Sequence, residues 1–388
     1  MDKIYDICCG IDVHKKLIVA CLNHKRKKEL REFGATTREL MELAEWLQKT
    51  TVRSLRWKVL VKAVPGRKTD VKDAEWITEL LQHGLLQPSY IPSKDQRELR
   101  ELVQYRKSLV GERTRELNRL QKMLEGANIK LSGTVTNING KSARKILEYI
   151  LSGNEIDEKK YDEMYEEKLI AHNLKASKEQ ILDDLKGFMS PLQRRMLKEL
   201  LQHLDELNVH IENLNDEIDN FMKPEEKQAS QMIQDVTGIG NTSAQAIIAV
   251  IGTDMERFPS DRHISSWAGL CPGDNISAKK RKGGKIRKGN ALLKSTLVLC
   301  AHAAVRHKSS YFHAQFKRIS THRGKKRAYV AVAHSILIAI YHILKDGVKY
   351  QDLGAEYYNQ FNAERKIHAY LKKLKALGWE PPKEAVPA

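Results

Sequence analysis

Three aspartates near the start of the chain have the type and spacing that could hold a divalent cation. Asp12 lies at the end of an apolar run, Ile4 to Val13, where a charge is costly unless it is paired or binds a metal. Asp70 and Asp73 are three residues apart at a predicted helix start, so both carboxylates face one side. Their oxygens suit Mg²⁺ and phosphodiester chemistry. A helix-capping pair with an unrelated strand-end acid explains the same spacing, so both interpretations stay open.

A second candidate is Ser277, which lies in a glycine- and lysine-rich segment, GLCPGDNISAKKRKGGKIRKGN (269–290). Lys279, Lys280 and Arg281 follow it directly, and such cations favour a serine alkoxide and stabilise charge on an attacked phosphate. No histidine lies within ten residues to act as a general base. From the residues alone, a serine that only contacts phosphate is the commoner outcome, and a nucleophile is the alternative.

The surroundings of Ser277 are unusually basic. From Asn275 to Lys345 the chain has no aspartate or glutamate but seventeen lysines and arginines, and its overall net charge is +18. Such a region concentrates phosphate and releases counterions on docking, which predicts a nucleic-acid partner. A solvated basic face is the plainer alternative, but the basic block is interleaved with apolar helical segments.

The segment VTGIGNTSAQAIIAVI (236–251) predicts the turn and second helix of a helix-hairpin-helix. Its two glycines allow close approach of a phosphate to a helix N-terminus. Gly-x-Gly is weak evidence alone and gains weight beside the basic block. The predicted nucleic-acid contacts are Gly238, Gly240, Lys279, Lys280, Arg281, Lys282, Lys285, Arg287 and Lys288.

The remaining pattern divides the chain into an α/β part and two helical parts. Strands are predicted at 4–13, 17–22, 28–33 and 57–61, with helices at 36–47 and 68–81. A charged helix is predicted at 95–125. Leu197, Leu200, Leu204, Leu207, Ile211, Leu214, Ile218 and Phe221 follow a heptad spacing. This narrow seam favours pairing with a second copy, and a self-contained helical bundle is the alternative.

We therefore predict domains at 1–94, 95–224 and 225–388, the last boundary being marked by Met222-Lys223-Pro224. The five cysteines have no metal-site spacing, and no signal-peptide or membrane-span pattern is evident. A cytoplasmic protein without a membrane partner is expected.

Four motifs together resemble one known family. CGIDVHKK (9–16), VPGRKTDVKDAEW (64–76), QYRKSLV (104–110) and the 236–294 block are similar to motifs of the DEDD-type insertion-sequence transposases, in the same order. The resemblance implies a RuvC/RNase H-like nuclease domain followed by a serine-bearing C-terminal domain. Asp12, Asp70 and Asp73 match acids that bind Mg²⁺, and Ser277 matches a serine that attacks DNA. The family also implies a structured guide RNA that pairs with donor and target DNA, with protomers joined by the coiled coil.

The chain departs from the family pattern at one point. The family has a second acid, a glutamate, on a strand before VPGRKTD, whereas no acid lies between Trp46 and Thr69 here. About thirty residues of the family pattern are missing. Glu45 and Glu75 are the candidate substitutes for the missing ligand, but Glu45 belongs to a predicted helix and its spacing does not recommend it. We therefore expect a truncated nuclease domain and an impaired copy of a transposase.

Three other functions compete with this one. A DNA- or RNA-binding remnant would keep the basic domain and the seam without chemistry. A stand-alone RuvC-like junction nuclease would need neither Ser277 nor the long basic region. A structural coiled-coil protein would leave the acid-free stretch without a purpose.

Overall fold

The computed structural model divides the chain into two compact units, residues 1–92 and 93–388. The described residues are 4–24, 27–50, 54–57, 69–86, 91–154, 156–170, 176–272, 276–277, 280–281, 286–360 and 363–379, with backbone only at 54–57, 276–277, 280–281, 358–359 and 363–366. The chain is mixed α/β and mostly helical, as the sequence predicts.

The smaller unit is built on a four-stranded sheet in the order β3-β2-β1-β4. Its strands are β1 (Ile7–Val13), β2 (Leu17–His24), β3 (Lys27–Gly34) and β4 (Ser54–Trp57). The first three form an antiparallel meander, and β4 pairs parallel with β1. The strand predicted at 57–61 is therefore found earlier, at β4, and residues 58–61 lie outside the described part of the chain.

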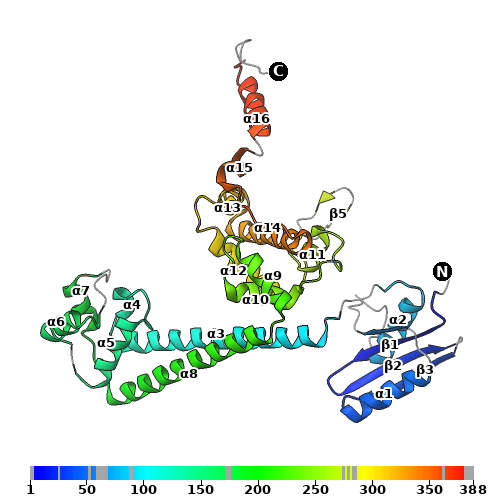
Figure 1. Cartoon of the computed structure of the whole chain (residues 1–388), viewed down its shortest axis with the longest axis horizontal. Helices are drawn as coiled ribbons and strands as arrows, with labels where there is room; N and C mark the ends of the chain where they lie inside the picture. The colour runs from blue at the N-terminus through cyan, green and yellow to red at the C-terminus, as the bar shows by residue number, and fades with distance from the viewer. Residues whose placement is uncertain are drawn as a thin grey trace. The chain divides into compact units, whose positions relative to one another are not determined.

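One helix covers each face of this sheet (Figure 1). α1 (Thr37–Lys49) packs Leu43, Trp46 and Leu47 on one face. α2 (Asp70–Gln82) packs Ala74 against Val19 on the other. Burial from both sides explains why β1 is an almost continuous apolar run, whereas β3, at the edge, is polar and exposed.

In the larger unit two long helices lie side by side: α3 (Lys94–Gly126) and α8 (Pro191–Phe221) (Figure 1). They run antiparallel, because Asp95 pairs with Lys223 at one end and Glu116 lies near His203 further along. The heptad seam of α8 is buried at Leu197, Leu201, Leu204, Leu207, Ile211, Leu214 and Ile218.

This arrangement changes the interpretation of the seam. Its leucines pack within this chain, against α3, rather than being free for a second copy. Leu200 is only half-buried, Leu201 takes its place, and Phe221 at the end is exposed. The self-contained alternative thus accounts for the seam, and pairing between copies stays a prediction without a surface assigned to it.

A buried arginine ties α3 to its neighbours. Arg106, the arginine of the QYRKSLV motif, donates to Asn215 Oδ1 on α8 (3.0 Å) and to Gln245 Oε1 (2.5 Å). It also donates to the carbonyl of Thr242 (3.1 Å). Gln245 and Thr242 belong to α10 (Asn241–Ile251), and Gln245 donates onward to Asp219 (2.8 Å). The motif arginine therefore joins three helices rather than facing a ligand.

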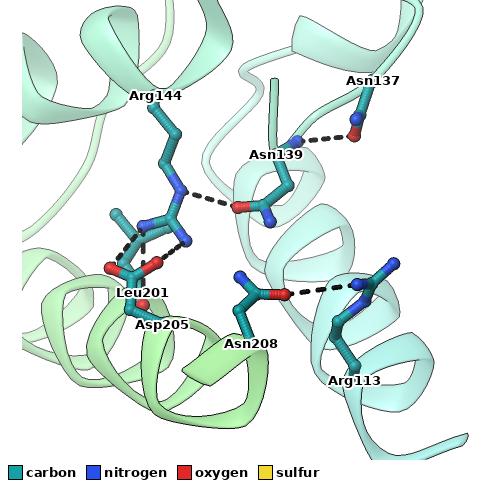
Figure 2. A network of polar contacts seen from close by, with 7 residues as sticks. All are labelled: Arg113, Asn137, Asn139, Arg144, Leu201, Asp205 and Asn208. Atoms are coloured by element: carbon teal, nitrogen blue, oxygen red, sulfur yellow. Dashed lines mark hydrogen bonds and ion pairs between the residues drawn. The ribbon is translucent and has the colours of Figure 1, made fainter. Parts of the chain in front are cut away.

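Four short helices pack beside the C-terminal end of α3 and the N-terminal end of α8: α4 (Leu131–Thr134), α5 (Lys141–Leu151), α6 (Glu158–Glu166) and α7 (Lys178–Leu185). They form a hydrophobic core of their own with the adjoining ends of α3 and α8. Figure 2 shows polar contacts between α5 and α8. The two terminal nitrogens of Arg144 donate to the carboxylate oxygens of Asp205 (2.6 and 3.2 Å), and its Nε donates to Asn139 Oδ1 (2.6 Å). Arg113 on α3 donates to Asn208 on α8 (3.2 Å).

The C-terminal part is helical, with one small hairpin of strands β5 (Ile276–Ser277) and β6 (Lys280–Arg281). Its remaining helices are α9 (Pro224–Gln234), α11 (Asp261–Trp267), α12 (Ala291–Ala304), α13 (Tyr311–Arg323), α14 (Lys325–Asp346), α15 (Gly354–Gln360) and α16 (Ala363–Ala376). One core joins α9, α11, α12, α13 and α14 to α3, α8 and α10. Among the described residues only α14 is long and apolar enough to cross a membrane, and its apolar residues are those of a buried core helix.

Removal of the Arg106 guanidinium should destabilise the larger unit. Arg106→Met keeps the aliphatic length but leaves buried acceptors on α8 and α10 unpaired, so we expect a loss of about 3 kcal/mol in the free energy of unfolding. Urea denaturation followed by far-UV circular dichroism measures this loss, since the unit is mostly helical. The exposed Arg97→Met on the same helix is the control and should change stability by less than about 0.5 kcal/mol. Equal effects of the two substitutions would contradict a stabilising role for the hydrogen bonds of Arg106.

Candidate functional site

Two of the three predicted acids come together in the smaller unit. Asp12 is on β1, Asp70 is in the first turn of α2, and His14 lies between them. The Nε2 atom of His14 is 3.1 Å from Asp12 Oδ2 and 3.1 Å from Asp70 Oδ1. In the described part of the chain these three residues form the one group of potential metal ligands whose ligand atoms all lie within 4.8 Å of one another. We call them the acidic site.

Local sequence explains why this site forms. Gly10 on β1 donates its N–H to Thr78 Oγ1 on α2 (3.0 Å), and a side chain at Gly10 would meet that oxygen at 2.5 Å. The glycine therefore allows α2 to lie directly against the strand. Thr69 caps α2 by accepting from the N–H of Lys72 (3.3 Å), which fixes where the helix and its first-turn aspartate begin.

Asp73 stands one turn beyond Asp70 and is not a member of the 4.8 Å group. Its Oδ1 atom is buried and has no hydrogen-bond partner among the described residues. A buried carboxylate oxygen without a donor is costly, and a cation would relieve that cost. The donor set of Asp12, Asp70 and Asp73 is all oxygen, which fits Mg²⁺. Such an ion would supply positive charge to a phosphate oxygen.

His14 is the site residue that sequence reasoning missed. The sequence places His14 in a turn, yet its spacing of two residues from Asp12 could have indicated that it lies beside that carboxylate. Side chains two apart on an extended strand project from the same face. His14 lies just past the end of β1, and this geometry carries it to the same carboxylates.

Ser277 lies in the larger unit, on the first strand of the small hairpin. The backbone pairs Ser277 with Lys280 and Ile276 with Arg281. A bridge between Pro272 and Ile286 closes the foot of the loop. Arg287 and Lys288 follow the foot and are exposed. The side chains of Ser277, Lys280 and Arg281, and the whole of Lys279, Lys282 and Lys285, lie outside the described residues.

The two glycines of the 236–251 turn differ in their surroundings. Gly238 has φ +93°, and a side chain there would meet the carbonyl of Cys300 at 2.5 Å and Ala304 N at 2.6 Å, both on α12. Gly240 is the N-cap of α10, with no side-chain cap, and a side-chain carbon added there would meet nothing within 4 Å. Close packing against α12 accounts for Gly238, whereas Gly240 leaves space at a helix N-terminus where phosphate could approach.

Comparison with known proteins bears on both sites. The sequence model of the transposase IS116/IS110/IS902 family matches residues 230–317. A second model, which describes the DEDD transposase of IS110, matches residues 60–129. Residues 60–129 and 230–317 therefore match transposase domains of the IS110/IS116 family. The first match contains Ser277 and both turn glycines, and the second contains Asp70 and Asp73. The family resemblance inferred from the motifs is thus confirmed.

Curated relatives agree with this assignment over part of their length. The chain is 32% identical over 108 residues to the transposase for insertion sequence element IS1111A of Coxiella burnetii, covering 27% of this chain and 29% of the relative. It is 28% identical over 131 residues to an uncharacterized 43.6 kDa protein of insertion element IS110 of Streptomyces coelicolor, covering 33% and 31%. The matched segments therefore span about a third of each relative.

The second acid that the family resemblance implies has no replacement in the group of ligand atoms that the described residues bring within 4.8 Å of one another. Glu45 is exposed on α1, and α1 packs on the face of the sheet opposite to α2. Glu75 is five residues beyond Asp70, which turns it away from that residue's side of α2. Residues 51–53 and 58–68, where the family pattern would resume, lie outside the described part.

Metal binding at the acidic site can be measured without any activity. We expect Asp70→Asn to weaken Mn²⁺ binding at least about tenfold, because even outer-shell partners of metal ligands are worth that much. Titration calorimetry or water-proton relaxation with the full chain would measure it. Glu79→Gln, an exposed acid on the same helix, is the matched control and should leave the affinity unchanged. Equal affinity of wild type and Asp70→Asn would rule out a metal role for this carboxylate.

The turn glycines give a second paired test. Gly238→Ala combines a positive φ with contacts under 3 Å, so it should destabilise the larger unit by about 2 to 4 kcal/mol. In Gly240→Ala the added carbon meets nothing within 4 Å, so we expect this variant to lose at most about 1 kcal/mol, the usual cost of alanine at an N-cap, and to weaken salt-dependent DNA binding. Thermal unfolding and fluorescence anisotropy with labelled DNA separate the two effects. Gly238→Ala as stable as wild type would contradict the packing role.

Proposed function

We propose that this chain is an insertion-sequence transposase that cuts and rejoins DNA through Ser277, assisted by a Mg²⁺ ion at the acidic site. The observation that carries the proposal is the convergence of Asp12 and Asp70, with Asp73 one turn beyond them. A RuvC/RNase H-like fold for the smaller unit is part of the proposal. Its support is the β3-β2-β1-β4 order with parallel β1 and β4 and a helix on each face.

The proposed reaction conserves the number of phosphodiester bonds. The Ser277 oxygen attacks a backbone phosphorus, a P–O(serine) bond forms, and the P–O bond to one deoxyribose breaks. The serine proton passes to a base, and the departing sugar oxygen is protonated to a hydroxyl. Attack of a second strand's hydroxyl on the phosphoserine reverses these steps and joins new partners, so no external energy source is required.

The residues of this chain would divide the work. Asp12, Asp70 and Asp73 hold the cation, and the His14 imidazole keeps the two nearest carboxylates in place through its contacts of 3.1 Å. Arg287 and Lys288, exposed at the foot of the serine hairpin, attract the DNA backbone together with the neighbouring basic residues. A guide RNA would supply sequence choice by base pairing. This chain's strongly basic composition supports backbone binding of either nucleic acid.

A catalytically inactive binding remnant is the second candidate. The missing second acid favours it, because a cation held by fewer carboxylates is bound less tightly and positioned less well. Both candidates predict salt-dependent DNA binding. They differ in whether a covalent protein–DNA bond ever forms, and the impaired-copy expectation predicts slow formation rather than none.

Trapping DNA on the protein distinguishes the candidates. The full chain would be incubated with Mg²⁺, labelled DNA spanning the element's junction and RNA transcribed from the flanking locus, and then denatured. We expect a slowly formed, denaturation-resistant adduct that Ser277→Ala abolishes and that Ser309→Ala, an exposed serine outside the site, retains. Removal of Mg²⁺ or the Asp70→Asn substitution should reduce the adduct.

Each contrary outcome has a defined meaning. Salt-dependent binding without any adduct would support the inactive remnant and reject the transposase proposal for this copy. An adduct that persists in Ser277→Ala would assign the nucleophile elsewhere. Absence of DNA binding would reject both candidates.

A further inference from the structure

A groove of about 760 Å³ opens at the foot of the serine hairpin. Pro272 and Ile286, the bridged pair that closes the loop, form one side of it. The other side is the first half of α14, with Gln315 of α13 beside it. Ser277 is five residues from Pro272, so at 3.3 to 3.6 Å per residue its backbone lies within about 18 Å of the groove. A strand bound in this groove therefore passes within about 18 Å of the candidate nucleophile.

The walls and the inner end of the groove differ in polarity. Leu270, Pro272, Ile286, Val330 and Ala331 supply apolar walls. At the inner end Gln315 donates its Nε2 to Ser335 Oγ (2.8 Å), while its buried Oε1 has no partner among the described residues. A buried carbonyl oxygen left unpaired is destabilising, and a ligand with an N–H group would satisfy it.

His334 adds a second polar group to the same lining. Burial lowers the pKa of this imidazole, against a smaller opposing effect of Asp261, so the ring is neutral at neutral pH. A neutral imidazole has one donor and one acceptor nitrogen. The combination of apolar walls, a free amide oxygen and a neutral imidazole is suited to the flat, polar-edged ring of a nucleobase rather than to a phosphate.

The rim of the groove has the opposite character. Lys326 and Arg327 line it from the first turn of α14, directly after Lys325. Three cations at the positive end of a helix, with no acid in that turn, are unfavourable unless an anion lies nearby. Backbone phosphates provide such anions, and the acid-free stretch 275–345 surrounds them with positive charge.

We propose that this groove holds one unstacked base of the DNA strand on which Ser277 acts, with its flanking phosphates on Lys326 and Arg327. Gln315 Oε1 accepts from an exocyclic amine of the base, which favours adenine, cytosine or guanine over thymine, whose one N–H donor is in the ring. The groove would then contribute sequence preference next to the cut, in addition to any pairing by RNA. This inference rests on the proposed function, since it assigns a substrate element to the same site.

Binding of short oligonucleotides tests the groove without requiring catalysis. The probe is a labelled single-stranded 12-mer with one adenine among abasic positions, compared with the same 12-mer that is abasic at that position too. Stacking and burial of one base predict that the full-length wild-type chain binds the adenine probe about tenfold more tightly than the abasic one. The same 12-mer with thymine in place of the adenine should bind with intermediate affinity.

Two substitutions locate the effect. Gln315→Leu removes the free acceptor at similar size and should bind the adenine and thymine probes equally. Ala331→Trp fills the groove and should abolish the preference for adenine over the abasic probe. Leu299→Trp, at an exposed leucine on α12, is the matched control and should keep wild-type discrimination. Circular dichroism verifies that each variant is folded.

The outcomes separate this inference from the proposed function. Equal binding of the adenine and abasic probes by the wild type would overturn the base pocket, whether or not the Ser277-dependent adduct forms. Base discrimination that survives Ala331→Trp would also overturn it. Discrimination that is lost in both groove variants but kept in Leu299→Trp supports it even if the adduct assay fails. Lys326→Ala should weaken all probes alike and reduce the salt dependence.

Discussion

Antiparallel packing of α3 on α8 is the interaction on which the larger unit depends. The two helices contribute to both of its hydrophobic cores, one at the short helices α4–α7 and one in the C-terminal part. Arg106 fixes this pairing to α10, because its guanidinium satisfies acceptors on both partners at once. The turn glycines that precede α10 and the serine hairpin belong to a part of the unit that shares this core. Displacement of α3 would therefore disturb the surface that is proposed to bind DNA.

A different constraint governs the acidic site. The site needs a helix N-terminus beside a strand end, and only a residue without a side chain permits α2 to approach β1 that closely. The hydrogen bonds of Thr78 to Gly10, Cys21 and Ala74 then hold the helix in register. His14 contacts both carboxylates, but it cannot replace the missing glutamate as a hard oxygen ligand. Under the proposed function, this is the physical reason to expect slow chemistry at the acidic site.

Charge and polarity are separated in the C-terminal part. The cations lie on the surface and at the rim of the groove beside the hairpin, whereas the inner end of that groove carries an amide oxygen and a neutral imidazole. A surface of cations alone would bind the phosphate backbone of any nucleic acid without sequence specificity. A neutral polar pocket beside those cations adds the possibility of reading one base. The division resembles the general distinction between contacts that position a nucleic acid and contacts that specify it.

Local patterns in the sequence determined the elements of this protein. The apolar run that contains Asp12, the apolar periodicity that begins at Thr36 and the heptad spacing of α8 each predicted an element that the structure contains, because periodicity acts over a few residues. The motifs likewise identified the family. Asp12 and Asp70 were singled out as ligands because a charge at a buried strand end and an acid at a helix start are visible in one dimension.

Tertiary structure decided which surfaces those elements share. A seam of leucines has the same spacing whether its partner is a second copy or α3, and only the fold of residues 94–126 against 191–221 shows the internal partner. The same holds for Gly238, whose role depends on α12, far along the sequence, and for His14, whose importance depends on α2. The groove beside Ser277 combines residues from α13, α14 and the hairpin foot. Contacts between segments distant in sequence are set by packing of whole elements, and no local pattern records them.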